Sequence, residues 1–264
     1  MGLLEPVLAH AAPFILVVFR LLGLFVLTPL LSSANVPRMV RVMIALSFAA
    51  AVYPTMPPPA GGPMDLDLVE LLPLMLTEVM IGSTIGLIAS IPLIALQMGG
   101  YFMGYQMGLA LAQAYNPELD TQSGVLGQLL FYLGMAAFVA LGGLDAVFMA
   151  LLDTFETLPS GVFASDVMPL ELLVAILTSS FEFALRIASP VMGVIVMILV
   201  ALGFMMKTMP QINVMSVGFA AKILAGLLTL SAMIFIIDEV SVDEMRKAID
   251  AILNWAQTLG GADA

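Results

Sequence analysis

The chain has 264 residues, of which 61% are apolar and only 10% are charged. Soluble domains average about 45–50% apolar and 25% charged residues, so this composition indicates an integral membrane protein. The net charge of −11, with only eight scattered lysines and arginines, argues against nucleic-acid binding, because that polymer is bound by clustered cations.

The apolar runs predict an all-α fold of membrane-type helices. They are long, lack the alternation of barrel strands and are rich in Leu, Ala, Met and Gly. A span needs about 20 residues, so the chain could hold about five to seven of them. Proline, glycine and charge divide the apolar mass into segments at residues 14–31, 42–53, 68–114, 125–152, 172–206 and 212–237.

Two of these segments are too long for one span. We expect residues 68–114 to form two helices or one broken helix with a kink at Pro92, and residues 172–206 to be interrupted at Pro190. Residues 238–259 read as an amphipathic tail. Proline, glycine and ionisable residues at mid-depth need a covering of protein or water, so most of the surface is expected to face other subunits.

Small residues recur at every fourth position in two separate runs of the third segment, the first beginning at Gly82 and the second at Gly100. They are Gly82, Gly86, Gly100, Gly104 and Gly108. Such a face admits a neighbouring backbone closely, and ordinary helix packing is the preferred interpretation. Met103 and Met107 form a stripe on an adjacent face, which is either core filling or a pliable gasket.

A polar, acidic loop follows this glycine-lined helix. Asn116 and Pro117 start a turn, and Glu118 and Asp120 are charged. A polar turn between helices is the default interpretation. A pore constriction with a movable element, however, would need this combination of a small-residue helix and a loop at its end.

No catalytic set is found in the sequence. The phosphate-binding pattern G-x-x-x-x-G-K-[ST] is missing, and a single histidine, His10, excludes paired-histidine metal sites. The lack of cysteine removes thiolate ligands and nucleophiles. We therefore expect no enzyme activity, cofactor or metal. Carboxylates in apolar segments could relay protons, but a structural role is preferred for each of Glu78, Glu156, Glu182 and Asp238.

Three motifs together resemble a known family. The runs "QMGLALAQAYNPELDTQSGVLGQLLFYL", "LLDTFETLPSG" and "MPQINVMSVGFAAKILAGLL" occur in the order and spacing of the FliR family, the flagellar T-type export-gate proteins of type III secretion. Weaker similarity in "PLLSSANVPRMVRVMIALSFAAAVYP" extends the resemblance over nearly the full length. Each motif is weak alone, but the set is specific and resembles the flagellar branch more than the injectisome branch.

The resemblance implies a non-catalytic subunit of the flagellar export gate. With FliP and FliQ it would form the entry channel for rod, hook and filament proteins, next to FlhB and FlhA, in the bacterial inner membrane at the flagellar basal body. It implies bent helical hairpins wound into a helical hetero-oligomeric assembly. Residues 1–264 would form one export-gate domain without a separate soluble domain.

The resemblance also assigns candidate site residues. The segment after the Q-M-G motif would enter and plug the channel, which points to Leu111, Ala114, Tyr115, Asn116, Pro117, Glu118, Leu119 and Asp120. Bulky aromatic residues are expected in this stretch and Ala114 is small, so Tyr115 or methionines of partner subunits would carry more of the seal.

The third motif reads as a structural break. Pro210 would end a helix, while Gln211 and Asn213 would satisfy the freed backbone groups or bond a neighbour. Lys222 would neutralise a carboxylate of a partner subunit, or extend its ammonium to an interface.

Two other functions compete with the gate. A secondary carrier for a small solute would use broken helices and mid-depth carboxylates, but it predicts two related halves, and no convincing internal repeat is found. A purely structural scaffold for the export apparatus would need the same partners without lining the channel.

Overall fold

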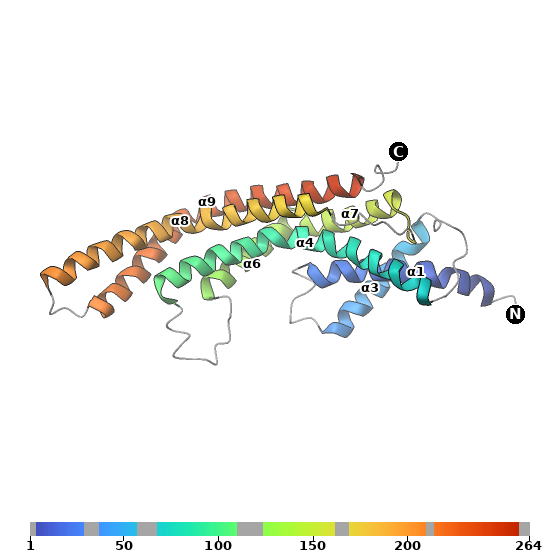
Figure 1. Cartoon of the computed structure of the whole chain (residues 1–264), viewed down its shortest axis with the longest axis horizontal. Coiled ribbons are helices and arrows are strands. Elements are labelled where there is room, and N and C mark those ends of the chain that lie inside the picture. Colours follow the sequence, from blue (N-terminus) through green and yellow to red (C-terminus); the bar gives the residue numbers. More distant parts are fainter. Residues whose placement is uncertain are drawn as a thin grey trace. The chain divides into compact units, whose positions relative to one another are not determined.

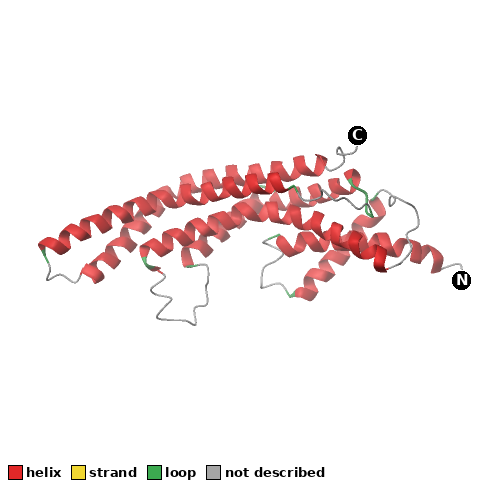
Figure 2. Ribbon diagram, in the orientation of Figure 1, coloured by secondary structure: helices red, strands yellow, loops and turns green. Residues whose placement is uncertain are grey.

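The structure is a computed structural model that describes residues 4–28, 37–56, 68–109, 124–161, 169–209 and 214–258. All regular elements in these ranges are helical, which confirms the all-α class (Figure 2). In chain order they are α1 (Leu4–Leu27), α3 (Arg38–Val52), the short 3₁₀ helix η1 (Tyr53–Thr55), α4 (Leu68–Met107), α6 (Val125–Ala140), α7 (Gly143–Thr157), α8 (Leu170–Thr208) and α9 (Val214–Thr258) (Figure 1).

Fewer helices could cross a membrane than the six apolar segments suggested. In the described ranges four are long and apolar enough, and α6 with α7 makes a fifth if the pair counts as one span. The segment at 42–53 corresponds to α3, whose 15 residues span about 22 Å and fall short of a hydrocarbon core of about 30 Å. The four long stretches are His10–Leu27, Leu71–Met107, Leu170–Thr208 and Ser216–Gln257.

The two double-length segments form single helices. Helix α4 continues for 40 residues through Pro92, and α8 continues for 39 residues through Pro190. The expected division of residues 68–114 into two helices and the expected interruption at Pro190 are therefore wrong. A proline removes one backbone hydrogen bond, and the many bonds of a long helix, together with packing around the buried Pro92, outweigh that loss. The tail after residue 237 likewise continues α9 to Thr258.

The segment at 125–152 is broken where one helix was expected. Helix α6 ends at Ala140, Gly142 adopts a left-handed conformation with φ of 74°, and α7 begins at Gly143. Glycine enters this conformation without the steric penalty of a Cβ, so it commonly ends a helix.

The backbone contacts divide the chain into two compact units. Unit 1 contains residues 1–91, 142–176 and 246–264, and unit 2 contains residues 92–141 and 177–245. In unit 1, α1 packs against α3, and Phe48 of α3 stacks on Phe148 of α7 with ring centroids 5.1 Å apart. Fully buried apolar side chains, among them Leu16 and Ile81, form the core of this unit.

Unit 2 leaves much of its apolar surface uncovered. The apolar window of α4 is 72% buried, whereas those of α8 and α9 are 28% and 17% buried. Large side chains such as Phe235, at 83% exposure, stand out from these helices. Apolar surface of this extent marks a face that lipid or another protein covers.

Candidate functional site

The second half of α4 packs by backbone contact in unit 2. A Cβ placed on Gly100 would come within 2.7 Å of the Cα atom of Gly127 in α6, and one on Gly127 would come within 2.8 Å of the carbonyl oxygen of Gln97. Gly99 faces the backbone of Ala184 in α8. Because Gly100 and Gly127 have no room for a side chain and Gly99 has little, α4 is held closely between α6 and α8.

The first half of α4 packs in the same way on α1 in unit 1. A Cβ on Gly82 would overlap the carbonyl oxygen of Arg20, and one on Gly86 would lie 2.9 Å from that of Leu24. On the opposing helix, a Cβ on Gly23 would overlap the carbonyl oxygen of Val79. Sequence reasoning missed Gly23, although it lies in an apolar run as Gly82 does.

Gly104 and Gly108 do not share this packing. A Cβ on Gly104 would lie 3.9 Å from the side chains of Leu109 and Leu126, which is an ordinary contact, so the expected close approach at Gly104 is not present within this chain. Gly108 follows the last residue of α4 with φ of 85°, and its N–H donates to the carbonyl oxygen of Tyr105 at 3.0 Å. Gly108 therefore ends the helix and does not extend its packing face.

Replacing Gly108 by alanine is expected to lower the free energy of unfolding by about 1–2 kcal/mol, because an L-residue is strained at this positive φ. The added methyl would also lie 3.2 Å from the ring of Phe219. Thermal unfolding of the purified chain in detergent would measure the change. Gly104→Ala is the matched control, and an equal loss in both variants would contradict the assignment.

Met103 and Met107 lie in the core of unit 2. Both are fully buried, and Met107 fits against Gly226 of α9, where a Cβ would meet its Cγ at 2.8 Å. A gasket needs thioethers that reach the channel, so this burial within the chain supports core filling for these two residues.

The end of α4 carries a nearby cation. The ammonium of Lys222 on α9 lies 3.8 Å from the position that a Cβ on Gly108 would take. The last carbonyl groups of a helix have no intrahelical partner and make its end negative, so a lysine is favourable there. Lys222 thus lies beside the end of α4 within its own chain.

The remaining predicted site residues lie outside the described ranges. The candidate plug residues from Leu111 to Asp120 follow α4 in the sequence, and Pro210, Gln211 and Asn213 lie between α8 and α9 in the sequence. The structure therefore locates the end of α4 before the first segment, and the end of α8 and the start of α9 on either side of the second.

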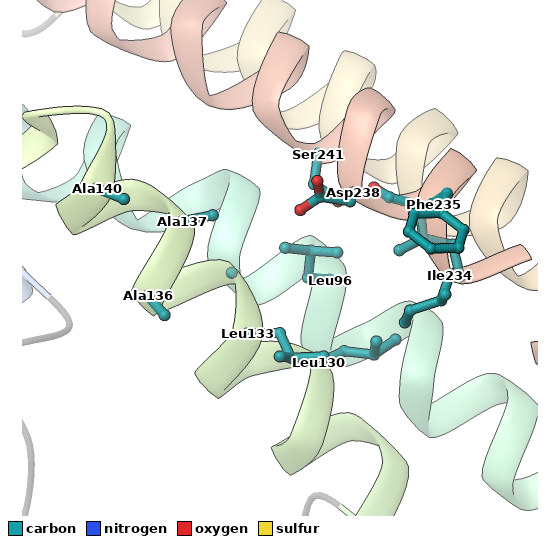
Figure 3. A pocket seen from close by; sticks show the side chains of 12 residues that line it. Leu96, Leu130, Leu133, Ala136, Ala137, Ala140, Ile234, Phe235, Asp238 and Ser241 are labelled. Atoms are coloured by element: carbon teal, nitrogen blue, oxygen red, sulfur yellow. Dashed lines mark hydrogen bonds between the residues drawn. The ribbon is translucent and has the colours of Figure 1, made fainter. Parts of the chain in front are cut away.

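A pocket of about 450 Å³ opens between α4, α6 and α9 in unit 2 (Figure 3). Its walls are almost entirely apolar, with Leu96, Leu130 and Phe235 among them. The exposed carboxylate of Asp238 lies at its edge, and the hydroxyl of Ser241 donates to the carbonyl oxygen of Ile237. A carrier site needs several converging polar groups, and this pocket offers one carboxylate.

In the described ranges, the single histidine and the carboxylates do not come together in a catalytic or metal-binding site. His10 is exposed, and its Nδ1 atom lies 2.9 Å from the hydroxyl of Tyr53. Glu156 and Glu182 are exposed. No group of three or more potential metal ligands occurs in the part of the chain that the structure describes.

Glu78 is a carboxylate buried in the interior of unit 1. Its exposed fraction is 2%, and its Oε2 atom accepts a hydrogen bond from Nε of Arg20 at 2.5 Å. This pairing agrees with the structural role preferred for Glu78. Sequence reasoning missed Arg20, whose signal is a single arginine inside an apolar run.

Comparison with known proteins gives a consistent result. The family described as Bacterial export proteins, family 1, matches residues 11–248. Flagellar biosynthetic protein FliR of Bacillus subtilis (strain 168) is 25% identical over 253 residues, which cover 94% of this chain and 95% of that protein. FliR of Escherichia coli (strain K12) is 26% identical over 216 residues, 81% of each chain. Yop proteins translocation protein T of Yersinia pestis is 32% identical over 146 residues, 54% of this chain and 55% of that protein.

Proposed function

The chain belongs to the bacterial export proteins, family 1, as a membrane-type subunit of a type III secretion export apparatus, and we propose that it helps to form and plug the entry channel of the flagellar export gate. The family match over residues 11–248 carries this proposal. It confirms the resemblance seen in the three motifs, and the solute-carrier alternative is not favoured.

The proposed plug is the loop after α4, at residues 111–120. Two observations support it. The glycine contacts with α6 and α8 fix the second half of α4, so the helix can present the loop from a rigid support. Gly108 ends the helix directly before the loop, and Lys222 lies beside that end. Pro210, Gln211 and Asn213 are proposed to form the break between α8 and α9.

The proposed partners are other export subunits, namely FliP and FliQ, with FlhB and FlhA as further neighbours. The sparse burial of α8 and α9 supports this, because a large apolar face needs a protein or lipid covering. We place the assembly at the flagellar basal body in the bacterial inner membrane, with flagellar rod, hook and filament proteins as its cargo. The whole chain would act as one export-gate domain without catalytic activity.

Co-purification tests the partnership. A tagged chain expressed with FliP and FliQ is expected to recover both in detergent, because the apolar face of α9 is uncovered without them. Phe235→Glu should lower recovery by about tenfold or more, since it puts a charge into that face. Phe235→Leu keeps the face apolar and is the matched control. A chain that purifies alone, or full recovery with Phe235→Glu, would contradict the proposed interface.

A further inference from the structure

Arg20 is an arginine with no exposed surface, in the second half of α1. Its guanidinium has acceptors on three sides. Nε donates to Oε2 of Glu78 in α4 at 2.5 Å, and Nη1 donates to the carbonyl oxygen and the hydroxyl of Thr154 in α7 at 3.0 and 3.1 Å. Nη2 donates to the carbonyl oxygen of Leu158 at 3.1 Å. The Phe155 ring centroid lies 4.0 Å from the guanidinium carbon.

Glu78 bonds both Arg20 and the turn after α7. While Oε2 accepts from Arg20, Oε1 accepts the backbone N–H of Gly161 at 3.3 Å. Two side chains from α1 and α4 thus hold both the end of α7 and the turn that follows it. Arg20, Glu78 and residues 154–161 all belong to unit 1.

Each element contributes a group that is costly to leave alone in an apolar interior. A buried arginine or glutamate needs a counter-charge and a full set of hydrogen bonds. The carbonyl oxygen of Leu158 lies just past the end of α7, which the helix dipole makes negative, and the carbonyl oxygen of Thr154 accepts the N–H of Leu158 as well as Nη1 of Arg20. The pairing of Arg20 with Glu78 and with these carbonyl oxygens satisfies all three at once.

We propose that Arg20, Glu78 and residues 154–161 form a latch that holds the end of α7 and the following turn against α1 and α4. The latch explains the motif "LLDTFETLPSG" physically. Thr154 and Leu158 accept from Arg20, Phe155 covers its guanidinium, and Gly161 donates to Glu78. This role is internal to unit 1 and does not depend on the export-gate proposal.

The geometry makes arginine specific at position 20. A planar guanidinium presents five N–H donors in a fixed fork, which here reach acceptors on α4 and on α7 together. A lysine ammonium is a compact point charge with three donors. It could neutralise Glu78, but it could not also hold Thr154 and Leu158.

The chain has no cysteine, so one introduced thiol reports on the latch without background. Ser160 lies in the turn held by the latch and is 8% exposed. In membranes containing the full-length Ser160→Cys chain, labelling by N-ethylmaleimide is expected to be slow. Adding Arg20→Lys should raise the labelling rate about tenfold or more, because the turn opens locally although the charge is kept.

Two controls separate local opening from unfolding. Ala49→Cys places a thiol at a fully buried position of α3 in the same unit, and its labelling should stay slow with Arg20→Lys. Arg38→Lys, at an exposed position, should not change the labelling of the Ser160→Cys chain. Unchanged labelling of that chain with Arg20→Lys would show that charge alone suffices and would overturn the latch.

A rise at both thiols would also overturn the latch, because it would show a general loss of packing. Glu78→Gln provides a second route. It keeps the shape and an acceptor for the Gly161 N–H but removes the counter-charge of Arg20, and it should also speed labelling of the Ser160→Cys chain. Protection that persists with Glu78→Gln would equally reject the proposal.

Discussion

Replacing Gly82 by alanine is expected to destabilise the chain, and replacing it by valine to prevent folding. A single Cβ at this position would overlap the carbonyl oxygen of Arg20 and come within 2.8 Å of the backbone nitrogen of Leu24. Overpacking costs about 1–3 kcal/mol where side chains can adjust. Here the obstacle is the backbone of α1, so the helices themselves must separate.

Separation of α1 from α4 would have a second consequence. The bond between Arg20 and Glu78 crosses the same helix pair. A shift at Gly82 would therefore also strain a buried ion pair, whose disruption costs about 3–5 kcal/mol. Against a total free energy of unfolding of about 5–15 kcal/mol, the valine variant should not accumulate as folded protein.

Gly193→Ala supplies the matched control. Gly193 lies inside α8, and a Cβ there would meet no atom within 4 Å. The helix propensity gain of up to about 1 kcal/mol is the same for both substitutions, so in the purified chain Gly193→Ala should be neutral or stabilising while Gly82→Ala is destabilising. Thermal unfolding in detergent shows directly whether each substitution raises or lowers the stability of the chain. Equal midpoints for the two alanine variants would contradict the tight packing of α1 on α4.

Composition and periodicity predicted the class of this fold well, because they report how apolar surface is distributed along the chain. They predicted its helix boundaries less well. Pro92 and Pro190 looked like breaks, yet both lie inside continuous helices, whereas the break falls at Gly142. From the sequence, a proline predicts only that one backbone hydrogen bond is lost. Whether the helix ends there depends on the packing around the proline, which the sequence does not reveal.

The buried charges show a second limit of sequence reasoning. Arg20 stands 58 residues from Glu78 and 134 residues from Thr154, so no local pattern connects them. A similar limit applies to the glycine repeat. Spacing placed Gly100 and Gly104 on one face, but Gly127 faces only the first of them closely. Which glycine is tight depends on where the neighbouring helix crosses.

Deleting residues 115–122 is expected to make cells that express the whole gate leak ions. The proposed plug lies in this loop, which follows the helix end at Gly108. The glycine contacts of α4 with α6 and α8 lie before the loop, so the deletion should leave the support and the assembly intact. An open channel of the size needed for a polypeptide would then conduct ions, and membrane conductance measures this directly.

A second variant separates the side chains of the loop from its length. Replacing residues 115–122 by eight glycines and serines restores the length but removes Tyr115, the turn at Asn116 and Pro117, and both carboxylates. If side chains make the seal, this variant should leak as the deletion does. If the loop only connects two helices, the gate with this variant should not leak ions. An assembled gate that stays tight with the deletion would place the seal on partner subunits and leave this chain the role of a scaffold.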